Sequence, residues 1–461
     1  MRILTFFLLS LNLSLEGEYR LERGSLADYF FATGSVDERF GKLSFGFDYI
    51  MQINSSVTTG RINLIPYLGG KFGFFQLSLL HFQKSLLGGM LLNAEHNVPL
   101  KLKRYIKGGG VEFYSGPFKA GLFTGQMIFY GFDQNSYFVE NDTLDNLRAL
   151  DLELDLSSFS LEGSYVRLNT RNMPASYSFD EIYGGKINLN LPFVLFQLQG
   201  ALRRGVDPVL YEIRRGYGFY FTSQFTSGNL SFSLGSHYYD SLRFLGYNTP
   251  PVLTERELLP GNGNSDKALS MGFSYSPGSY YFEFKASSVI DPGERNFFRP
   301  QSGKALEELF FKGNFNLWRG MRMDFKAGRD FLMGVEPEYE KLYTYYLSLG
   351  ANIPSLKELD LEIKPAFNRE DDVNYWSLSF EVGFKLPSDI VPVFTVDYNS
   401  VKLARFENEN FWPYLEIRRN FEYGYFLLGV GAQKGGLVCS GGICRYVNPF
   451  KGLKVSLNLG I

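Results

Sequence analysis

Two cysteines form the sharpest motif in this chain that could do chemistry. The stretch "GLVCSGGICRYV", residues 436–447, holds Cys439 and Cys444, the two cysteines among 461 residues. Gly441-Gly442 suits a two-residue hairpin turn, and that register sets Cys439 opposite Cys444 at disulfide range. In an oxidising compartment we expect the pair to form a disulfide; the alternative is two free thiols. We expect no metal site, because zinc takes four ligands and no histidine is nearby in sequence.

The three histidines offer a second kind of chemistry. "NAEHN" sets Glu95 beside His96 in an expected loop, and acid–histidine pairs serve as general bases in some hydrolases. The sequence fixes no nucleophile beside them, and it has no P-loop, GxSxG, HExxH or Rossmann pattern. We therefore expect no enzyme and no cofactor, and structural roles for His81 and His237.

The elements that hold these residues are predicted to be strands. In "LDLELDLSSFSLEGSYVRL", four leucines alternate with Asp151, Glu153 and Asp155, and a second alternating arm follows Ser157-Ser158. A period of two in both arms predicts a β-hairpin. One face is apolar (Leu150, Leu152, Leu154 and Leu156), and the other is acidic.

This hairpin pattern repeats along the chain. Further arms of about ten residues turn near 193, 228, 278, 320, 356, 388 and 420, and long polar segments such as 240–266 and 291–305 separate the hairpins. Short turns at one end and long loops at the other are typical of an outer-membrane barrel. We predict an all-β fold: a single transmembrane antiparallel β-barrel of about 22 strands (range 18–24), with short periplasmic turns and long extracellular loops.

The N-terminus predicts export. Arg2 precedes the apolar run from Ile3 to Leu15, which is too short to span a membrane as a helix. We expect a signal peptide over 1–17, a short periplasmic segment over 18–42 and the barrel over 43–461; the alternative for the apolar run is a buried first strand. Beyond it no apolar run reaches 18 residues, which excludes helical spans. The expected location is the outer membrane of a diderm bacterium.

The composition and net charge of the chain limit the partners that it is expected to bind. The formal net charge of −2 gives no electrostatic reason to bind nucleic acid. Aromatic residues are 17% of the chain and charged residues 20%, which suits alternating strands with interfacial aromatics. Outer-membrane lipid and the barrel assembly machinery are the expected partners.

Charges on the inward faces could shape a lumen. The acids Asp151, Glu153, Asp155 and Glu162 are expected to line one sector, and Arg203, Arg215, Arg322 and Arg329 are expected on other inward faces. Facing one another, they would set up a transverse field that selects polar solutes. The alternative is that the lumen charges simply pair along the wall.

The ending "GGLVCSGGICRYVNPFKGLKVSLNLGI" resembles the C-terminus of an uncharacterised family of outer-membrane β-barrel proteins from Bacteroidetes and related lineages, a domain of unknown function with a Cys…Cys-Arg-Tyr segment. A looser match covers residues 74–113. The resemblance implies an outer-membrane barrel and no known activity.

We therefore expect a porin-like channel or transporter for polar or amphipathic solutes. A barrel of this width would be open unless it is filled: long loops could fold inward, the cross-section could be narrowed, or a partner could fill it. The candidate inward segment is Gln83–Ile106, with Glu95 and His96. The alternative is a non-conducting surface scaffold, or a barrel subunit of an adhesion or secretion complex with a periplasmic or surface protein partner. A fatty-acid transporter would need an apolar lumen pocket, which the acids near 151–155 disfavour.

Overall fold

A computed structural model describes most of the chain. The described residues are 12–22, 29–40, 42–54, 59–95, 103–132, 138–169, 179–206, 213–242, 248–257, 265–297, 300, 303–317, 320–334, 341–354, 358–403, 406, 408–440, 443–447 and 449–460. None of their helices is long and apolar enough to cross a membrane.

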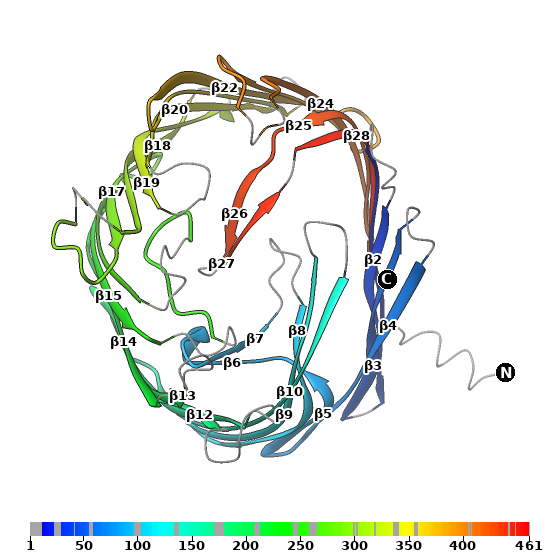
Figure 1. The fold of residues 1–461 in the computed structure, drawn as a ribbon, viewed down its shortest axis with the longest axis vertical. Helices are drawn as coiled ribbons and strands as arrows, with labels where there is room; N and C mark the ends of the chain where they lie inside the picture. Colours follow the sequence, from blue (N-terminus) through cyan, green and yellow to red (C-terminus); the bar gives the residue numbers. More distant parts are fainter. Residues whose placement is uncertain are drawn as a thin grey trace.

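Twenty-four of the described strands form one antiparallel sheet that closes into a barrel. Neighbours in sequence pair with each other around the ring, and β1 (Asn12–Glu22) pairs both with β2 (Tyr29–Phe40) and with β28 (Phe450–Gly460). Figure 1 shows the ring in a view along the strands. Closure leaves no sheet edge unpaired, which a sheet in lipid requires because hydrocarbon offers no hydrogen-bond partners.

The remaining wall strands follow one another in chain order. They are β3 (Leu43–Asn54), β4 (Thr59–Phe72), β5 (Phe75–Phe82), β8 (Lys103–Ser115), β9 (Phe118–Phe132), β10 (Phe138–Leu156), β11 (Phe159–Asn169), β12 (Phe179–Leu191), β13 (Val194–Val206), β14 (Ile213–Ser227), β15 (Leu230–Asp240), β16 (Ser265–Tyr275), β17 (Tyr280–Ile290), β18 (Ala305–Asn316), β19 (Arg322–Met333), β20 (Lys341–Ile353), β21 (Leu359–Glu370), β22 (Val373–Gly383), β23 (Ile390–Asn399), β24 (Phe411–Phe421) and β25 (Gly424–Gln433).

Five short elements lie outside the wall. β6 (Lys84–Leu86), the 3-10 turn η1 (Leu87–Gly89) and β7 (Leu92–Ala94) follow β5, and β26 (Gly436–Ser440) and β27 (Ile443–Val447) form a separate hairpin. Figure 1 shows both groups inside the outline of the ring. The first group packs against wall residues such as Leu147 and Val166, so this part of the chain occupies some of the lumen.

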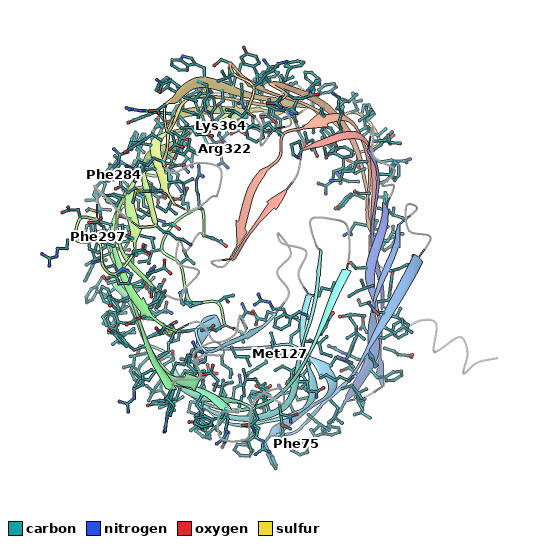
Figure 2. All side chains as sticks on the ribbon, viewed as in Figure 1. Phe75, Met127, Phe284, Phe297, Arg322 and Lys364 are labelled. Carbon is teal, nitrogen blue, oxygen red and sulfur yellow. The ribbon has the colours of Figure 1, made fainter. Side chains whose placement is uncertain are left out.

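The two faces of the wall differ as a membrane requires. Large apolar side chains stand exposed on the outer face, among them Leu150, Leu152 and Leu156, whereas Asp151 on the alternate face is 3% exposed. Figure 2 shows Phe75 and Phe284 pointing away from the ring and Met127, Arg322 and Lys364 on its inner side. Apolar side chains meet lipid, and polar ones meet the lumen.

The two rims of the barrel are also unequal. The turns at 157–158, 192–193, 228–229 and 422–423 all join strands at the rim that holds the start of β1 and the end of β28. Most connections at the opposite rim are longer, such as 241–264 and 291–304; an exception is the two-residue turn 371–372. The predicted asymmetry of the rims is confirmed, and in outer-membrane barrels the rim with short turns is the periplasmic one. The sequence also predicts a long polar segment over residues 131–146, but this connection is shorter, because β9 ends at Phe132 and β10 begins at Phe138.

The N-terminal boundary differs from the sequence prediction. From Leu43 onward the wall has the 22 strands that were counted, but β1 and β2 add two more. Residues 18–42, predicted as a short periplasmic segment, instead supply most of these two strands. The signal peptide stays a prediction: residues 1–11 lie outside the described residues, and 12–17 form the first part of β1.

Candidate functional site: the lumen and its two inward segments

The first inward segment, residues 83–95, packs into the lumen as a small apolar core. Its side chains Leu86, Leu87, Met90, Leu91 and Leu92 are fully buried. They join lumen-facing residues of the wall in one cluster, which includes Met127, Leu147, Val166, Ile182, Tyr239 and Val289. The segment Gln83–Ile106 that the sequence predicts as inward is inward over 83–95, whereas residues 103–106 begin the wall strand β8. Glu95 is exposed just after β7, and His96 lies outside the described residues.

A tight turn lets this segment double back. Leu87, Gly88 and Gly89 all have positive φ, at 51°, 57° and 91°. A Cβ on Gly89 would meet the side-chain oxygen of Thr249 at 2.7 Å and its carbonyl at 2.8 Å. Glycine is therefore required there by conformation and by space.

Charged groups of the wall anchor the same segment. Lys84 Nζ lies 2.8 Å from Glu112 Oε1 and 3.3 Å from Asp151 Oδ2. The backbone N–H of Leu87 donates to Glu162 Oε1 at 2.8 Å. Two of the predicted lumen acids, Asp151 and Glu162, thus hold the inward segment rather than face open water. Charge-assisted bonds of this kind are strong when partly buried.

The second inward segment, residues 248–257, lies in the β15–β16 connection and rests on the first. Asn248 Nδ2 donates to the Met90 carbonyl at 2.9 Å, and the Thr249 N–H donates to the Gly89 carbonyl at 2.8 Å. Asn93 Nδ2 donates to Thr249 Oγ1 at 2.5 Å. The two segments form one body inside the barrel.

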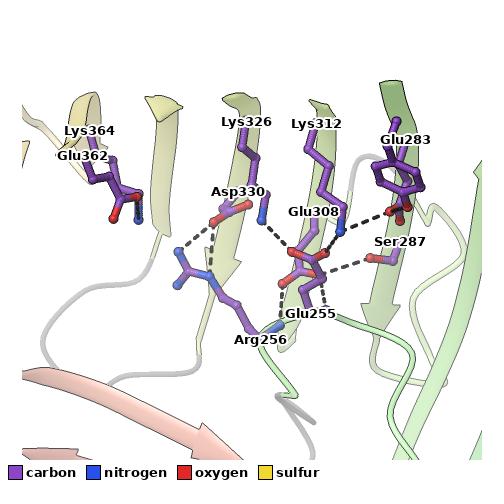
Figure 3. Close-up of polar contacts among 11 residues, drawn as sticks. Glu255, Arg256, Glu283, Ser287, Glu308, Lys312, Lys326, Asp330, Glu362 and Lys364 are labelled. Carbon is purple, nitrogen blue, oxygen red and sulfur yellow. Dashed lines mark hydrogen bonds and ion pairs between the residues drawn. The ribbon is translucent and has the colours of Figure 1, made fainter. Parts of the chain in front are cut away.

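The tip of the second segment is clamped to the wall by charge (Figure 3). Glu255 Oε1 lies 3.1 Å from Lys312 Nζ, and Glu255 Oε2 lies 2.5 Å from Lys326 Nζ. Arg256 Nη2 lies 2.7 Å from Asp330 Oδ2. β18 and β19 supply these wall groups.

The backbone of the tip is held as well. The N–H groups of Glu255 and Arg256 donate to the two oxygens of Glu308, at 2.8 and 3.0 Å. Ser287 Oγ donates to the same carboxylate at 3.2 Å. Together with the side-chain pairs, these bonds fix the tip as a latch, defined as Glu255 and Arg256 with their wall partners Lys312, Lys326, Glu308 and Asp330.

Glu255 stays ionised inside the latch. Partial burial raises the pKa of its carboxyl, but hydrogen bonds and charge attraction from Lys326 and Lys312 outweigh burial and hold the pKa below its usual value of 4.5. The Glu255 carboxylate is therefore charged at neutral pH.

Beyond the latch the lumen wall is polar and hollow. A cavity of about 600 Å³ is lined from β17 to β22 by residues such as Asn314, Arg322, Asp324, Ser348, Asn352 and Glu381. A second cavity of about 470 Å³ adjoins the latch and extends to Lys364 and Asp397. One side of the barrel is thus filled by the inward segments, and the other keeps hydrophilic space.

The charges predicted for the lumen do not face one another across it. Arg203 pairs with Asp180 on the neighbouring strand at 2.6 Å, and Arg322 pairs with Asp324 on its own strand at 2.9 Å. Glu153 lies 3.5 Å from Lys119, and Asp155 is exposed near the periplasmic turn. The arrangement matches local pairing along the wall, not a transverse field.

Two of the predicted lumen arginines lie on the outer face instead. Arg215 shares the exposed face of β14 with Ile213, Tyr217 and Phe219. Arg329 shares the outer face of β19 with Phe325 and pairs with Glu307 at 2.5 Å. Both assignments fail because the side-chain alternation puts odd positions of these strands outside.

The remaining candidate residues are the two cysteines and two of the histidines. β26 and β27 pair with Cys439 opposite Cys444, the register that was predicted, and the disulfide itself stays a prediction. His237 is 1% exposed and stacks on Tyr239 with ring centroids 4.5 Å apart. His81 Nδ1 lies 2.8 Å from the Pro66 carbonyl.

The latch has no recognisable pattern in the sequence. Glu255 and Arg256 stand in a long polar stretch that reads as an ordinary surface loop. The available signal was on the wall: Glu308, Lys312, Lys326 and Asp330 all fall on the inward face of β18 and β19, where such a density of charge needs partners.

Comparison with known proteins supports the fold. A model described as "Family of unknown function (DUF6029)" matches residues 349–461, and no curated protein matches the chain. The chain is similar to the translocation pore of the P pilus usher PapC, with 9% identity and a TM-score of 0.53 over 98% of this chain and 99% of that one. It is also similar to the siderophore receptor PirA from Pseudomonas aeruginosa, with 11% identity and a TM-score of 0.50 over 98% and 80%.

At such identities these likenesses show the fold alone. This chain is an outer-membrane β-barrel. The closed sheet, the apolar outer face and the unequal rims agree with that fold, which places the chain in the outer membrane of a diderm bacterium. The match over 349–461 covers the ending on which the resemblance to an uncharacterised barrel family rests.

Proposed function

We propose that this barrel is a porin-like channel for polar solutes whose bore is narrowed by the two inward segments. The observation that carries the proposal is the polar hollow on the β17–β22 side of the lumen, beside a body that fills the other side. A hydrophilic wall lets water and polar solutes pass, whereas a structural core would be packed with apolar side chains.

The latch makes this channel adjustable. It joins the second inward segment to the wall by ion pairs that border both cavities, so releasing the tip would widen the bore. Amphipathic solutes suit the same path, because tyrosines such as Tyr281 and Tyr346 stand among the charged groups. The proposed function includes no catalytic step.

The test is conductance of the purified full-length chain in planar bilayers, together with swelling of protein-loaded liposomes in sugars of increasing size. We expect ohmic channels and size-limited sugar entry. Absence of both, in the wild type and in a variant with the latch removed, would refute the channel.

A scaffold is the second candidate function, and the packed body in the lumen favours it. Twenty buried residues from the first inward segment, the second and the wall form one apolar cluster, which a permanently closed barrel would also show. In that case we expect no flux and a stoichiometric protein partner on gentle purification. Neither result is expected of a channel acting alone.

A further inference from the structure

A row of arginines crosses the outer face of five neighbouring strands. Cross-strand pairing sets Arg148 opposite Arg167, Arg167 opposite Glu181, Glu181 opposite Arg204 and Arg204 opposite Arg215. Direct partners in an antiparallel sheet stand on one face with Cβ atoms about 4.5–5.5 Å apart. Four guanidinium groups and one carboxylate therefore follow one line, here called the arginine row.

The row lies outside the barrel, directly above apolar wall. The next outward positions toward the periplasmic turns are also direct partners: Leu150, Tyr165, Tyr183, Leu202 and Tyr217. Four of these five are exposed large apolar or aromatic side chains, at 36–50%. Such a belt marks the edge of the hydrocarbon layer.

The row belongs to the extracellular rim. Arg167, Glu181, Arg204 and Arg215 are each the third residue from the loop-side end of their strands. Arg148 is at the same level, because it pairs with Arg167 in the longer strand β10. The row therefore meets the outer leaflet where its head groups begin.

Among the residues that the structure describes, most of the positive charge in the row has no acidic partner. Glu181 Oε1 lies 3.2 Å from Arg167 Nη1 and also accepts a hydrogen bond from the Tyr165 hydroxyl at 2.9 Å. Within the described part of the chain, Arg148, Arg204 and Arg215 are exposed and form no ion pair. Like charges directly opposite one another destabilise a sheet, so Arg204 beside Arg215 and Arg148 beside Arg167 call for anions.

Local contacts hold two of these groups in place. The guanidinium carbons of Arg167 and Arg204 lie 5.4 and 5.7 Å from the centre of the Phe179 ring. Stacking of this kind orders an arginine and leaves its N–H edges free for bidentate bonds.

We propose that the arginine row binds the phosphate groups of the phosphorylated glycolipid in the outer leaflet. Guanidinium groups bind phosphate in bidentate fashion, and the leucine and tyrosine belt below would receive the acyl chains. A second copy of this chain fits less well, since a two-fold contact would set arginine against arginine. The row ends with Arg215 on β14, and the nearest paired residue on β15 is the acidic Asp240, opposite Tyr217.

The test titrates the full-length protein in detergent micelles with bisphosphorylated lipid A and follows bound lipid by native mass spectrometry. The variant Arg148→Gln/Arg204→Gln/Arg215→Gln removes three charges at nearly constant length. Each arginine near an anionic surface contributes roughly a fivefold gain in affinity, so the triple variant should bind about a hundredfold more weakly. Each single variant should lose about fivefold, which keeps the test valid if the triple variant fails to fold.

Arg369→Gln is the matched control. Arg369 is an exposed arginine near the same rim on β21, but its cross-strand partners are Tyr343 and Asn374, so no second arginine stands beside it. Its binding should match wild type, and dephosphorylated lipid A should bind all variants equally weakly. The proposal would be overturned if folded single variants bound lipid A as tightly as wild type, or if wild type bound dephosphorylated lipid A equally well. It would also be overturned if inorganic phosphate competed as well as lipid A, or if the variants lost a protein dimer and kept their bound lipid.

Discussion

Glu255 carries the charge that closes the latch, and its titration should control the bore. Its folded-state pKa lies below 4.5, so its ion pairs hold above that value and are lost as pH falls through the lowered pKa. We expect conductance to stay constant as pH falls from 7 to the usual carboxyl pKa of 4.5, and to rise only below it. Single-channel recording across this range measures the effect.

Substitution separates the latch from general acid effects. Glu255→Gln leaves Lys326 without its partner, a loss of about 1–3 kcal/mol, and should give the low-pH conductance already at pH 7. Glu362→Gln is the control, because Glu362 is a lumen carboxylate whose ion pair is with Lys364, not with an inward segment. Equal behaviour of the two variants would count against the latch.

The hairpin at 150–168 tests which solvent lies on each side of the wall. Leu152 is 41% exposed on the outer face, so Leu152→Lys puts a charge into lipid at a cost of about 2–4 kcal/mol and should block assembly. Glu153→Lys faces the lumen beside Lys119 and should assemble, with ion selectivity shifted toward anions. Heat-modifiable gel mobility reports assembly, and reversal potentials report selectivity. Normal assembly of Leu152→Lys would contradict the assignment of the faces.

At the residue scale, alternation predicted orientation only where the strand register could be fixed. The Leu150 hairpin has an unbroken apolar–acidic pattern, and its faces follow from it. Arg215 and Arg329 were assigned to the wrong face because charged side chains near a rim can stand outside as well as inside. Alternation with a period of two shows which residues share a face, but it shows which face is inside only where a neighbour is known to be buried. Pairing partners such as Arg204 become known only from the three-dimensional register.

The two inward segments differ in how well their positions could be predicted from the sequence. Residues 83–95 could be predicted, since leucines and glycines interrupt the strand pattern there. Residues 248–257 could not, because they are held by hydrogen bonds to the first segment and by ion pairs with β18 and β19, all with residues distant in sequence. Contacts of that kind produce no periodic pattern in the sequence.

Removing the first inward segment should open the lumen. A Gly-Ser linker in place of residues 84–95 takes away the apolar body and the support of Thr249, so the second segment loses its base as well. We expect conductance to rise, roughly doubling or more, because barrels of 16–18 strands already hold a water-filled bore. Lys84→Met should show a smaller rise, and Lys364→Met, which alters a lumen lysine away from both segments, should show none. An unchanged bore in the linker variant would mean that the segment does not block the path.

The β26–β27 hairpin gives a second prediction for an element. Because Cys439 and Cys444 are direct partners, their Cα atoms fall within the range that a disulfide spans. Mass spectrometry of the purified protein without reductant should find both thiols oxidised in one cross-linked peptide. If both cysteines were fully alkylated before reduction, they would be free thiols in the protein, and the disulfide prediction would be wrong.

At the scale of the whole molecule, closure of the barrel depends on β1 and β2, which lie where the sequence predicts a signal peptide and a periplasmic segment. "NLSLEGEYRLE" in β1 alternates apolar or small residues (Leu13, Leu15, Gly17, Tyr19 and Leu21) with polar ones, but the adjoining apolar run favoured a signal peptide. One segment can satisfy both patterns, and only pairing with β28 distinguishes them. An even strand number with both ends at one rim follows in either case.

Cross-linking tests whether β1 and β28 close the ring. Glu18 and Ser456 are direct partners, so Glu18→Cys/Ser456→Cys in a Cys439→Ser/Cys444→Ser background places two thiols within disulfide range. Oxidation of assembled protein should join the chain almost end to end and change its mobility on unfolding gels, reversibly with reductant. Glu18→Cys/Lys454→Cys is the matched control, because residues two positions out of register stand about 7–8 Å apart and should not bridge. Equal cross-linking of both pairs would indicate a mobile N-terminus, and no cross-linking of either would mean that the barrel closes between β28 and a different strand.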